Sequence, residues 1–160
     1  ALNATPCFMY MPILLENEKL REALMKESII AQTYQTMKAC DVAFVGIGDM
    51  SEKSHFWQKQ FVSPDELRYL KQYRAVGEVC THYYDVNGTL IQSGIEKRAL
   101  AIDYEAYRKI PVRVGVGCGA EKTKAIVGAA RGRYINVLIT DKKTAEGIFQ
   151  TLDSPEAAKS

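Results

Sequence analysis

The chain has 160 residues, of which 47% are hydrophobic and 25% charged, and its 21 basic and 19 acidic side chains leave a formal net charge of +2. This size and composition predict one soluble domain, residues 1–160, that can bury a core. The near balance of charge argues against DNA binding by this chain alone. No apolar stretch approaches the eighteen residues that a membrane-spanning helix needs.

The amino terminus and the cysteines bear on compartment and metal content. Residues 1–12 lack a basic region ahead of an apolar stretch, so they do not read as a secretory signal and we expect a cytoplasmic protein. No C-x-x-C pair occurs, and neither histidine has metal-ligand spacing to a cysteine. We therefore predict no metal and no cofactor, and free thiols at Cys7, Cys40, Cys80 and Cys118.

The first third of the chain predicts two helices followed by a buried strand. Asn17 is placed to cap the first helix, and Ser28 starts a second apolar pattern with helical spacing. Residues 41–45 then read as a strand that ends in Gly46 and Gly48. Ligands of open α/β sheets collect at such strand ends, although a simple tight turn explains the glycines equally well. The polar residues 49–61, with Trp57, predict a loop or lid.

The middle of the chain predicts a capped helix and a hairpin. Ser63, Pro64 and Glu66 form a capping box with proline at the first helical position. Alternation through residues 79–83 and again at 89–91, around Asn87 and Gly88, predicts two antiparallel strands. Asp85 precedes this turn, where an acid usually bonds backbone amides, and a ligand role is the less common alternative.

The last third predicts a strand, a glycine turn, a helix, another strand and a capped helix. The strand covers residues 112–116, and the turn VGVGCGAEK contains Gly119, followed by Glu121 and Lys122 at the first turn of a helix. Unpaired amides at a helix start carry partial positive charge, and Lys122 would add a full charge. The turn therefore suits an anion.

Three interpretations of this glycine turn remain open from the residues alone. The turn can simply pack helix against sheet. It can belong to a dinucleotide site, because Gly115, Gly117 and Ala120 fit a relaxed G-x-G-x-x-A pattern and Asp141 ends the next strand, although Asp141 also suits a helix cap. It can also form a sugar-phosphate pocket.

Several phrases in order and at characteristic spacing resemble one known family. DVAFVGIGDM, AVGEVCTHYYDVNG and VGCGAEKTKAIVGAARGRYINVLITDKKTAEGIF are similar to the effector-binding domain of SorC-family bacterial transcriptional regulators, as is the opening MPILLENEKLREALM. The resemblance covers nearly the whole chain.

This resemblance implies an α/β fold with a Rossmann-like three-layer sheet of the sugar-phosphate isomerase and deaminase (NagB/RpiA/CoA transferase-like) type. It implies a phosphorylated sugar as effector, a homo-oligomer (dimer or tetramer), and DNA binding only through a separate helix-turn-helix domain. The ligand-binding residues that it implies are Gly46, Gly48, Asp85, Arg98, Gly119, Glu121 and Lys122.

The related fold also raises an enzymatic alternative. In a sugar-phosphate isomerase or deaminase, Glu121 would act as general base and Lys122 would hold an enolate or phosphate. Adjacent helical residues diverge by about 100°, so the two side chains need not converge. We therefore expect a sensor rather than an enzyme.

One departure from the family pattern concerns the phosphate. Members of the family carry a helix-turn-helix domain and then a first strand with a G-G-T-like phosphate loop, and neither pattern occurs in residues 1–160. We therefore expect an incomplete fold with an unpaired sheet edge and weak ligand binding.

Overall fold

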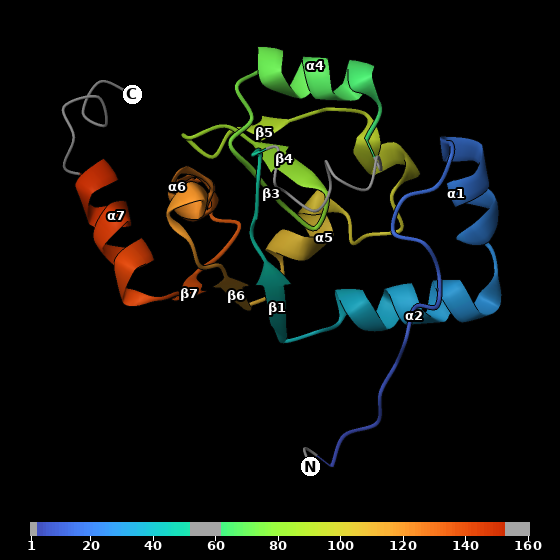
Figure 1. The fold of residues 1–160 in the computed structure, drawn as a ribbon. Helices are drawn as coiled ribbons and strands as arrows, with labels where there is room; N and C mark the ends of the chain where they lie inside the picture. Colours follow the sequence, from blue (N-terminus) through green and yellow to red (C-terminus); the bar gives the residue numbers. More distant parts are fainter. Residues whose placement is uncertain (1–2, 52–61, 153–160) are drawn as a thin grey trace.

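Figure 1 shows the computed structural model, which describes residues 3–51 and 62–152. The described strands form two small sheets, a parallel one in the order β1-β6-β7 and an antiparallel one in the order β2-β3-β4-β5. Their bounds are β1 Val42–Gly46, β2 Gly48–Asp49, β3 Gly77–Val79, β4 His82–Tyr84, β5 Leu90–Ile91, β6 Val112–Val116 and β7 Val137–Ile139.

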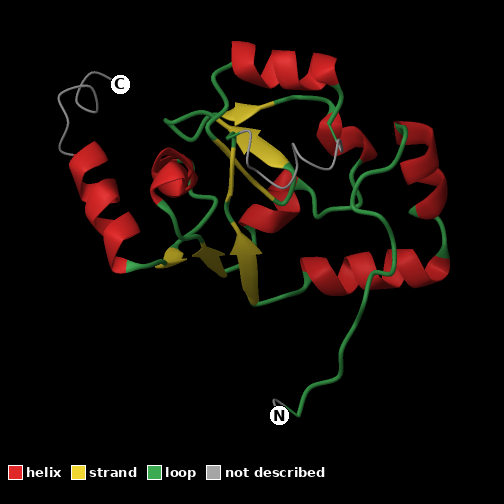
Figure 2. Cartoon of the chain, in the orientation of Figure 1, coloured by secondary structure: helices red, strands yellow, loops and turns green. Residues whose placement is uncertain are grey.

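Helices and 3-10 turns lie beside these sheets and over part of them (Figure 2). In Figure 1, α4 lies over the antiparallel sheet, α2 leads into β1, and α7 lies beside α6 at the other end of the molecule. Their bounds are α1 Glu18–Leu24, α2 Ser28–Lys38, α4 Pro64–Gln72, η1 Ile95–Arg98, α5 Tyr104–Arg108, η2 Ala120–Lys122, α6 Thr123–Arg131 and α7 Lys142–Leu152.

The capping contacts predicted at the starts of α1 and α4 are confirmed. The Asn17 side chain accepts from the Leu20 amide at the start of α1. Ser63 accepts from the Glu66 amide while Glu66 accepts from the Ser63 amide, which completes the capping box of α4. These two starts are set by local sequence, because each cap bonds a group three residues away.

One face of the parallel sheet carries the main core. Ala43 and Val45 pack there against a cluster of buried side chains from α5, α6 and the segments beside them. That cluster contains the fully buried Tyr107 and Ile126. The Tyr107 hydroxyl donates to the Tyr134 carbonyl at 2.7 Å, which joins α5 to the chain that enters β7.

The opposite face of the parallel sheet is apolar and largely exposed, although Val114 in its central strand is buried. Parallel register pairs Val42 with Val112 and Gly46 with Val116, and paired residues share a face. The large side chains exposed on that face are Val42, Phe44, Val112, Val116, Val137 and Ile139, from 37% for Val112 to 70% for Phe44. Parallel sheets are normally covered on both faces, so this face lacks a layer among the described residues.

The prediction that one strand runs through residues 79–83 is wrong at Thr81. β3 ends at Val79 and β4 begins at His82, with Cys80 and Thr81 at φ 52° and 66° between them. Two positive φ values in a two-residue loop define a type I′ hairpin, whose twist matches the flanking strands. The Thr81 amide donates to the buried Glu78 carboxylate at 2.9 Å, which holds a turn that lacks the usual Asn-Gly pair.

Two further expectations from the sequence concern the lid and a membrane-spanning helix. The predicted lid lies mainly at residues 52–61, including Trp57, outside the described residues. No helix in the described ranges has both the length and the apolar composition to cross a bilayer.

Candidate functional site

The two glycine turns predicted at strand ends lie next to each other. β1 and β6 are parallel neighbours, with Gly46 opposite Val116, so the turns that follow them leave the same edge of the sheet. The Ile47 amide donates to the Val116 carbonyl at 3.1 Å just beyond the strands. Gly46 and Gly48 therefore approach the turn that contains Gly119 and Lys122. This carboxyl edge is where open α/β sheets bind ligands.

Lys122 spans the gap between the two turns. Its ammonium group donates to the Ile47 carbonyl at 2.8 Å. A β-carbon added at Gly117 would lie 3.7 Å from the Lys122 Cδ, so the lysine stem passes over this glycine. The side chain is half-buried, and its charge is thus held at the edge of the sheet rather than released into solvent.

Glu78, which we did not select from the sequence, also belongs to this edge. It pairs with Gly48 across β2 and β3. A β-carbon on Gly48 would come within 2.5 Å of the Glu78 Oε1, so the carboxylate lies over that glycine. Only 9% of Glu78 is exposed. A charged residue inside the otherwise apolar strand AVGEV was the signal that could have identified it.

The environment of Glu78 favours its protonated form. Burial raises the pKa of Glu78 to about 6, although the Thr81 amide and the positive charge of Lys122 both act to lower it. The lysine charge and the buried carboxyl are therefore electrostatically coupled. A ligand hydroxyl that meets Glu78 would find an acceptor at high pH and a donor at low pH.

Glu78→Gln should remove one component of the pH dependence of stability. The folded pKa of about 6 exceeds the ordinary value of 4.5, so the folded state binds more protons between these pH values. The stability that Glu78 contributes is full below pH 4.5 and falls by about 2 kcal/mol as the pH rises through 6.

Urea unfolding of both proteins between pH 4 and pH 8 measures this difference. The wild-type free energy of unfolding minus that of Glu78→Gln should decrease by about 2 kcal/mol across the range. A difference that stays constant or grows with pH would show that the Glu78 pKa is not raised.

The glycine turn after β6 is tied to the start of α7. Thr140 donates its hydroxyl to the Gly117 carbonyl at 2.6 Å, and the Gly119 amide donates to the Thr144 hydroxyl at 2.8 Å. The Asp141 carboxylate accepts from the amide and the hydroxyl of Thr144, which places its pKa at about 2. Asp141 is therefore a helix cap, and its carboxylate is not directed at a ribose as the dinucleotide interpretation requires.

Glu121 and Lys122 lie at a helix start, as the sequence predicted, but this first turn is a 3-10 turn rather than an α-helical one. They lie in the 3-10 turn η2, just before α6, which is closed by the Lys122 amide donating to the Gly119 carbonyl. Gly119 has φ 118°, and a β-carbon there would lie 2.3 Å from the Glu121 Oε1. Glu121 thus folds back over Gly119, while Lys122 extends toward Ile47. The two side chains do not converge.

Asp85 lies in the β4–β5 turn. Its Oδ1 accepts from the amides of Asn87 at 2.9 Å and Thr89 at 2.8 Å. This is the turn role that the sequence favoured. Glu78 and Lys122, which lie together at the sheet edge, are called the Glu78–Lys122 group. Asp85 is not part of this group, so its ligand role stays a prediction from the resemblance.

Arg98 lies in η1 and binds protein groups. Its guanidinium pairs with the Glu66 carboxylate at 3.0 Å and donates to the Leu15 carbonyl at 2.8 Å. Burial would raise the pKa of Glu66, but hydrogen bonds from Arg98 and Ser63 outweigh burial and lower it. Arg98 joins α4 to the segment before α1, and its ligand role also stays a prediction.

Arg98→Met should destabilise the fold because it leaves the half-buried Glu66 carboxylate without its positive partner and the Leu15 carbonyl without its donor. We expect a loss of about 2 kcal/mol in the free energy of unfolding. Arg68→Met is the matched control, because Arg68 pairs with Asp65 at 3.0 Å but both side chains are more than three-quarters exposed. The control should change stability by less than about 0.5 kcal/mol. Urea unfolding measures both variants, and equal decreases in their free energies of unfolding would show that the Arg98 contacts stabilise the fold no more than an exposed ion pair does.

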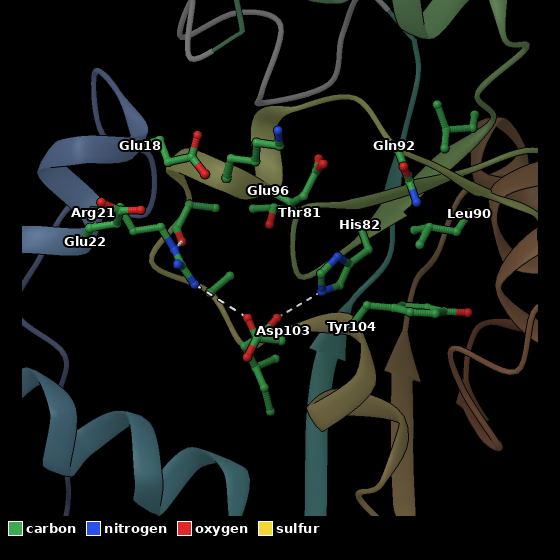
Figure 3. Close-up of a pocket in the computed structure, with 15 residues that line it drawn as sticks. Glu18, Arg21, Glu22, Thr81, His82, Leu90, Gln92, Glu96, Asp103 and Tyr104 are labelled. Carbon is green, nitrogen blue, oxygen red and sulfur yellow. Dashed lines mark hydrogen bonds and ion pairs between the residues drawn. The ribbon is translucent and has the colours of Figure 1, made fainter. Parts of the chain in front are cut away.

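A metal site and a cavity were also sought among the described residues. No group of three or more His, Cys, Asp or Glu side chains within residues 3–51 and 62–152 is arranged to hold a metal ion. A cavity of about 330 Å³ lies elsewhere (Figure 3), and none of the seven ligand-binding residues predicted from the sequence lines it.

The chain matches known proteins over most of its length. Residues 1–150 match the family model described as "Putative sugar-binding domain". The sorbitol operon regulator of Klebsiella pneumoniae is 32% identical over 135 residues, which cover 84% of this chain and 43% of the regulator. Transcriptional regulator LsrR of Escherichia coli K12 is 30% identical over 88% of this chain and 45% of its own length.

Solved structures agree with this match. A transcriptional regulator from Streptococcus pneumoniae superposes with a TM-score of 0.82 at 28% identity, covering 92% of this chain and 56% of that chain. The full-length sorbitol operon regulator SorC of Klebsiella pneumoniae gives a TM-score of 0.77 at 31% identity, covering 85% and 44%. The chain spans about half the length of the curated relatives it matches. It belongs to the sugar-binding domain family of SorC-type transcriptional regulators.

Proposed function

We propose that this domain senses a phosphorylated sugar for a DNA-binding regulator of sugar metabolism. The observation that carries the proposal is the Glu78–Lys122 group at the carboxyl edge of β1 and β6. A half-buried ammonium held at 2.8 Å from the Ile47 carbonyl can exchange that neutral partner for a charged ligand oxyanion. Glu78 beside it supplies a hydroxyl partner.

Gly46 would give the ligand close access to the backbone, whereas Gly48 and Gly119 make room for carboxylates of the protein itself. Gly46 has no atom within 4 Å of an added β-carbon, which leaves open space at the end of β1. Gly48 and Gly119 border the same edge, with Glu78 and Glu121 lying over them. We propose that Gly46 and Gly48 form the pocket floor and that Gly119, Glu121 and Lys122 close its far side.

Binding without turnover fits this geometry better than catalysis. An isomerase or deaminase needs a base and an electrophile directed at one substrate atom. Glu121 and Lys122 point apart, and the buried Glu78 carboxylate is held by the Thr81 amide of its own turn. We therefore propose a sensor rather than an isomerase or deaminase. The names of the relatives are those of regulators.

We also propose that this domain works together with further segments. The exposed apolar face of the parallel sheet and the outer edge of β1 are suited to an additional βα layer that carries a phosphate loop. A helix-turn-helix domain would then provide DNA contact, and a dimer or tetramer in the cytoplasm would transmit the effector signal. The coverage of about half of each relative supports this arrangement.

A thermal-shift screen tests the proposed function. The present chain and a version extended by the segments of a SorC-type regulator are compared against sugar phosphates, the matching free sugars and NAD. Stabilisation by one sugar phosphate, stronger in the extended protein, is the expected result. A shift with NAD, or no shift with any sugar phosphate, would refute the proposal. Product formation in NMR spectra after long incubation would establish the enzymatic alternative.

A further inference from the structure

A short chain of hydrogen bonds connects the start of α7 to the turn that carries Lys122. The Gly119 amide donates to the Thr144 hydroxyl at 2.8 Å, and that hydroxyl donates to the Asp141 carboxylate at 2.6 Å. The Gly119 carbonyl in turn accepts from the Lys122 amide at 3.0 Å. Thr144 is only 1% exposed. It therefore joins the capped start of α7 to the residue whose ammonium lies at the sheet edge.

The direction of these bonds is fixed by the charge of Asp141. Its Oδ2 accepts from the Thr144 hydroxyl and its Oδ1 from the Thr144 amide at 3.0 Å. The hydroxyl bond, followed by the amide bond, lowers the pKa of Asp141 to about 2. The carboxylate is thus ionised near neutral pH and can only accept. The single hydroxyl proton of Thr144 is committed to Asp141, so its oxygen lone pairs are left for the Gly119 amide.

Gly119 needs this contact because its backbone conformation is unusual. Its φ of 118° and ψ of 140° lie in a region that glycine alone adopts readily, and glycine can also leave it readily. The other end of the turn is held separately, since the Gly117 amide donates to the Ile139 carbonyl at 3.2 Å. Lys122 follows Gly119 in the chain, so the contact with Thr144 holds the end of the turn from which the lysine extends.

We propose that Thr144 and Asp141 are positioning residues of the effector site, which hold Gly119 so that the Lys122 ammonium is presented at the edge of β1 and β6. This inference rests on the proposed function, in which Lys122 binds the sugar phosphate. Thr144 is buried and acts through the turn rather than by touching the effector. A site whose supporting contacts leave a charged group about 1 Å too loose loses much of its affinity.

Amide hydrogen exchange of the ¹⁵N-labelled chain tests the arrangement without any effector. Thr144→Val keeps the β-branched shape but removes both hydroxyl contacts, so the Gly119 and Lys122 amides should exchange about tenfold faster. Thr144→Ser keeps the hydroxyl and should restore slow exchange. Unchanged exchange at both amides in Thr144→Val would overturn the proposal.

Asp141→Asn separates the bond to the hydroxyl from the helix cap. The asparagine oxygen can still accept from the Thr144 amide, but its NH₂ group takes the place of Oδ2 and only donates. The Thr144 oxygen would then meet two donors, and the Gly119 amide should again exchange faster while the later turns of α7 exchange as in the wild type. Wild-type exchange at Gly119 would show that Asp141 does not orient Thr144.

Affinity tests the functional part of the proposal. Phosphates of glucose, fructose, sorbitol and ribose are titrated calorimetrically into the extended protein of the thermal-shift screen. Thr144→Val should bind about tenfold more weakly than the wild type, and Thr144→Ser should recover affinity to within about threefold. Ile148→Val is the matched control, because Ile148 lies on the same helix and packs against the main core. It should lower the melting temperature by a few degrees and leave affinity unchanged. Equal weakening in Ile148→Val and Thr144→Val would mean that lost stability explains the effect, which would overturn the positioning role.

The two measurements separate this inference from the proposed function. Wild-type affinity in Thr144→Val would refute the positioning role and leave the proposed function standing. If the wild-type protein bound none of these sugar phosphates while exchange changed as expected, the proposed function would fail, and the contact between Thr144 and Gly119 would only stabilise the turn.

Discussion

Gly88→Ala should lower the free energy of unfolding by about 4 kcal/mol, the largest stability effect that we expect from a single methyl group. Gly88 has φ 81°, and an added β-carbon would lie 2.1 Å from the Gly132 amide nitrogen and 2.7 Å from the Gly128 carbonyl oxygen. These are backbone atoms at the end of α6, so no side chain can rotate away. The β4–β5 hairpin is held against that helix by this close approach.

Gly94→Ala is the matched control for Gly88→Ala. Gly94 has nearly the same φ, 82°, but no atom lies within 4 Å of its added β-carbon. It should lose only about 1 kcal/mol, the cost of a left-handed conformation for alanine. Urea unfolding measures both variants. If the two losses were equal, backbone conformation rather than contact with α6 would account for the effect of Gly88.

Lys122→Met should weaken binding of the proposed sugar-phosphate effector about 100-fold, because it removes the ammonium that is held at the edge of β1 and β6. Methionine retains most of the apolar stem over Gly117. The unliganded protein should lose about 1 kcal/mol of stability, since the Ile47 carbonyl loses its donor and Glu78 loses a nearby positive charge.

Lys124→Met controls for net charge in this prediction. Lys124 lies in α6, two residues from Lys122, and is exposed. Isothermal titration calorimetry with the sugar phosphate found in the screen should give wild-type affinity for Lys124→Met and about 100-fold weaker binding for Lys122→Met. Similar affinities for both variants would show that Lys122 does not contact the effector.

Local patterns in the sequence predicted much of the fold correctly. The Ser63 capping box, the Asn17 cap and the strand at residues 112–116 appear where their residue types require. Each depends on residues within a few positions, which is why one sequence suffices. The order of motifs also identified the family, which fixes the long-range arrangement that local patterns do not.

The remaining features depend on contacts between distant segments. The turn at Cys80 and Thr81 contains none of the usual turn residues, and it depends on Glu78 accepting from the Thr81 amide. Glu78 joins the site because β2 pairs with β3, so that the carboxylate lies over Gly48. Such pairing is set by tertiary packing rather than by spacing.

The predicted site residues also divide into those placed by local pattern and those engaged by distant segments. Gly46, Gly48, Gly119 and Lys122 follow neighbouring strands and lie along one edge. Asp85 and Arg98 come from other elements, where nearby amides and Glu66 engage them. Spacing along the chain could not reveal those partners.

The most direct test of the central claim is a crystal structure of the effector bound to the extended regulator. We predict that the Lys122 ammonium leaves the Ile47 carbonyl and lies within hydrogen-bond distance of the sugar phosphate, with a ligand hydroxyl on Glu78. An effector bound elsewhere, with the ammonium still on the Ile47 carbonyl, would contradict the account.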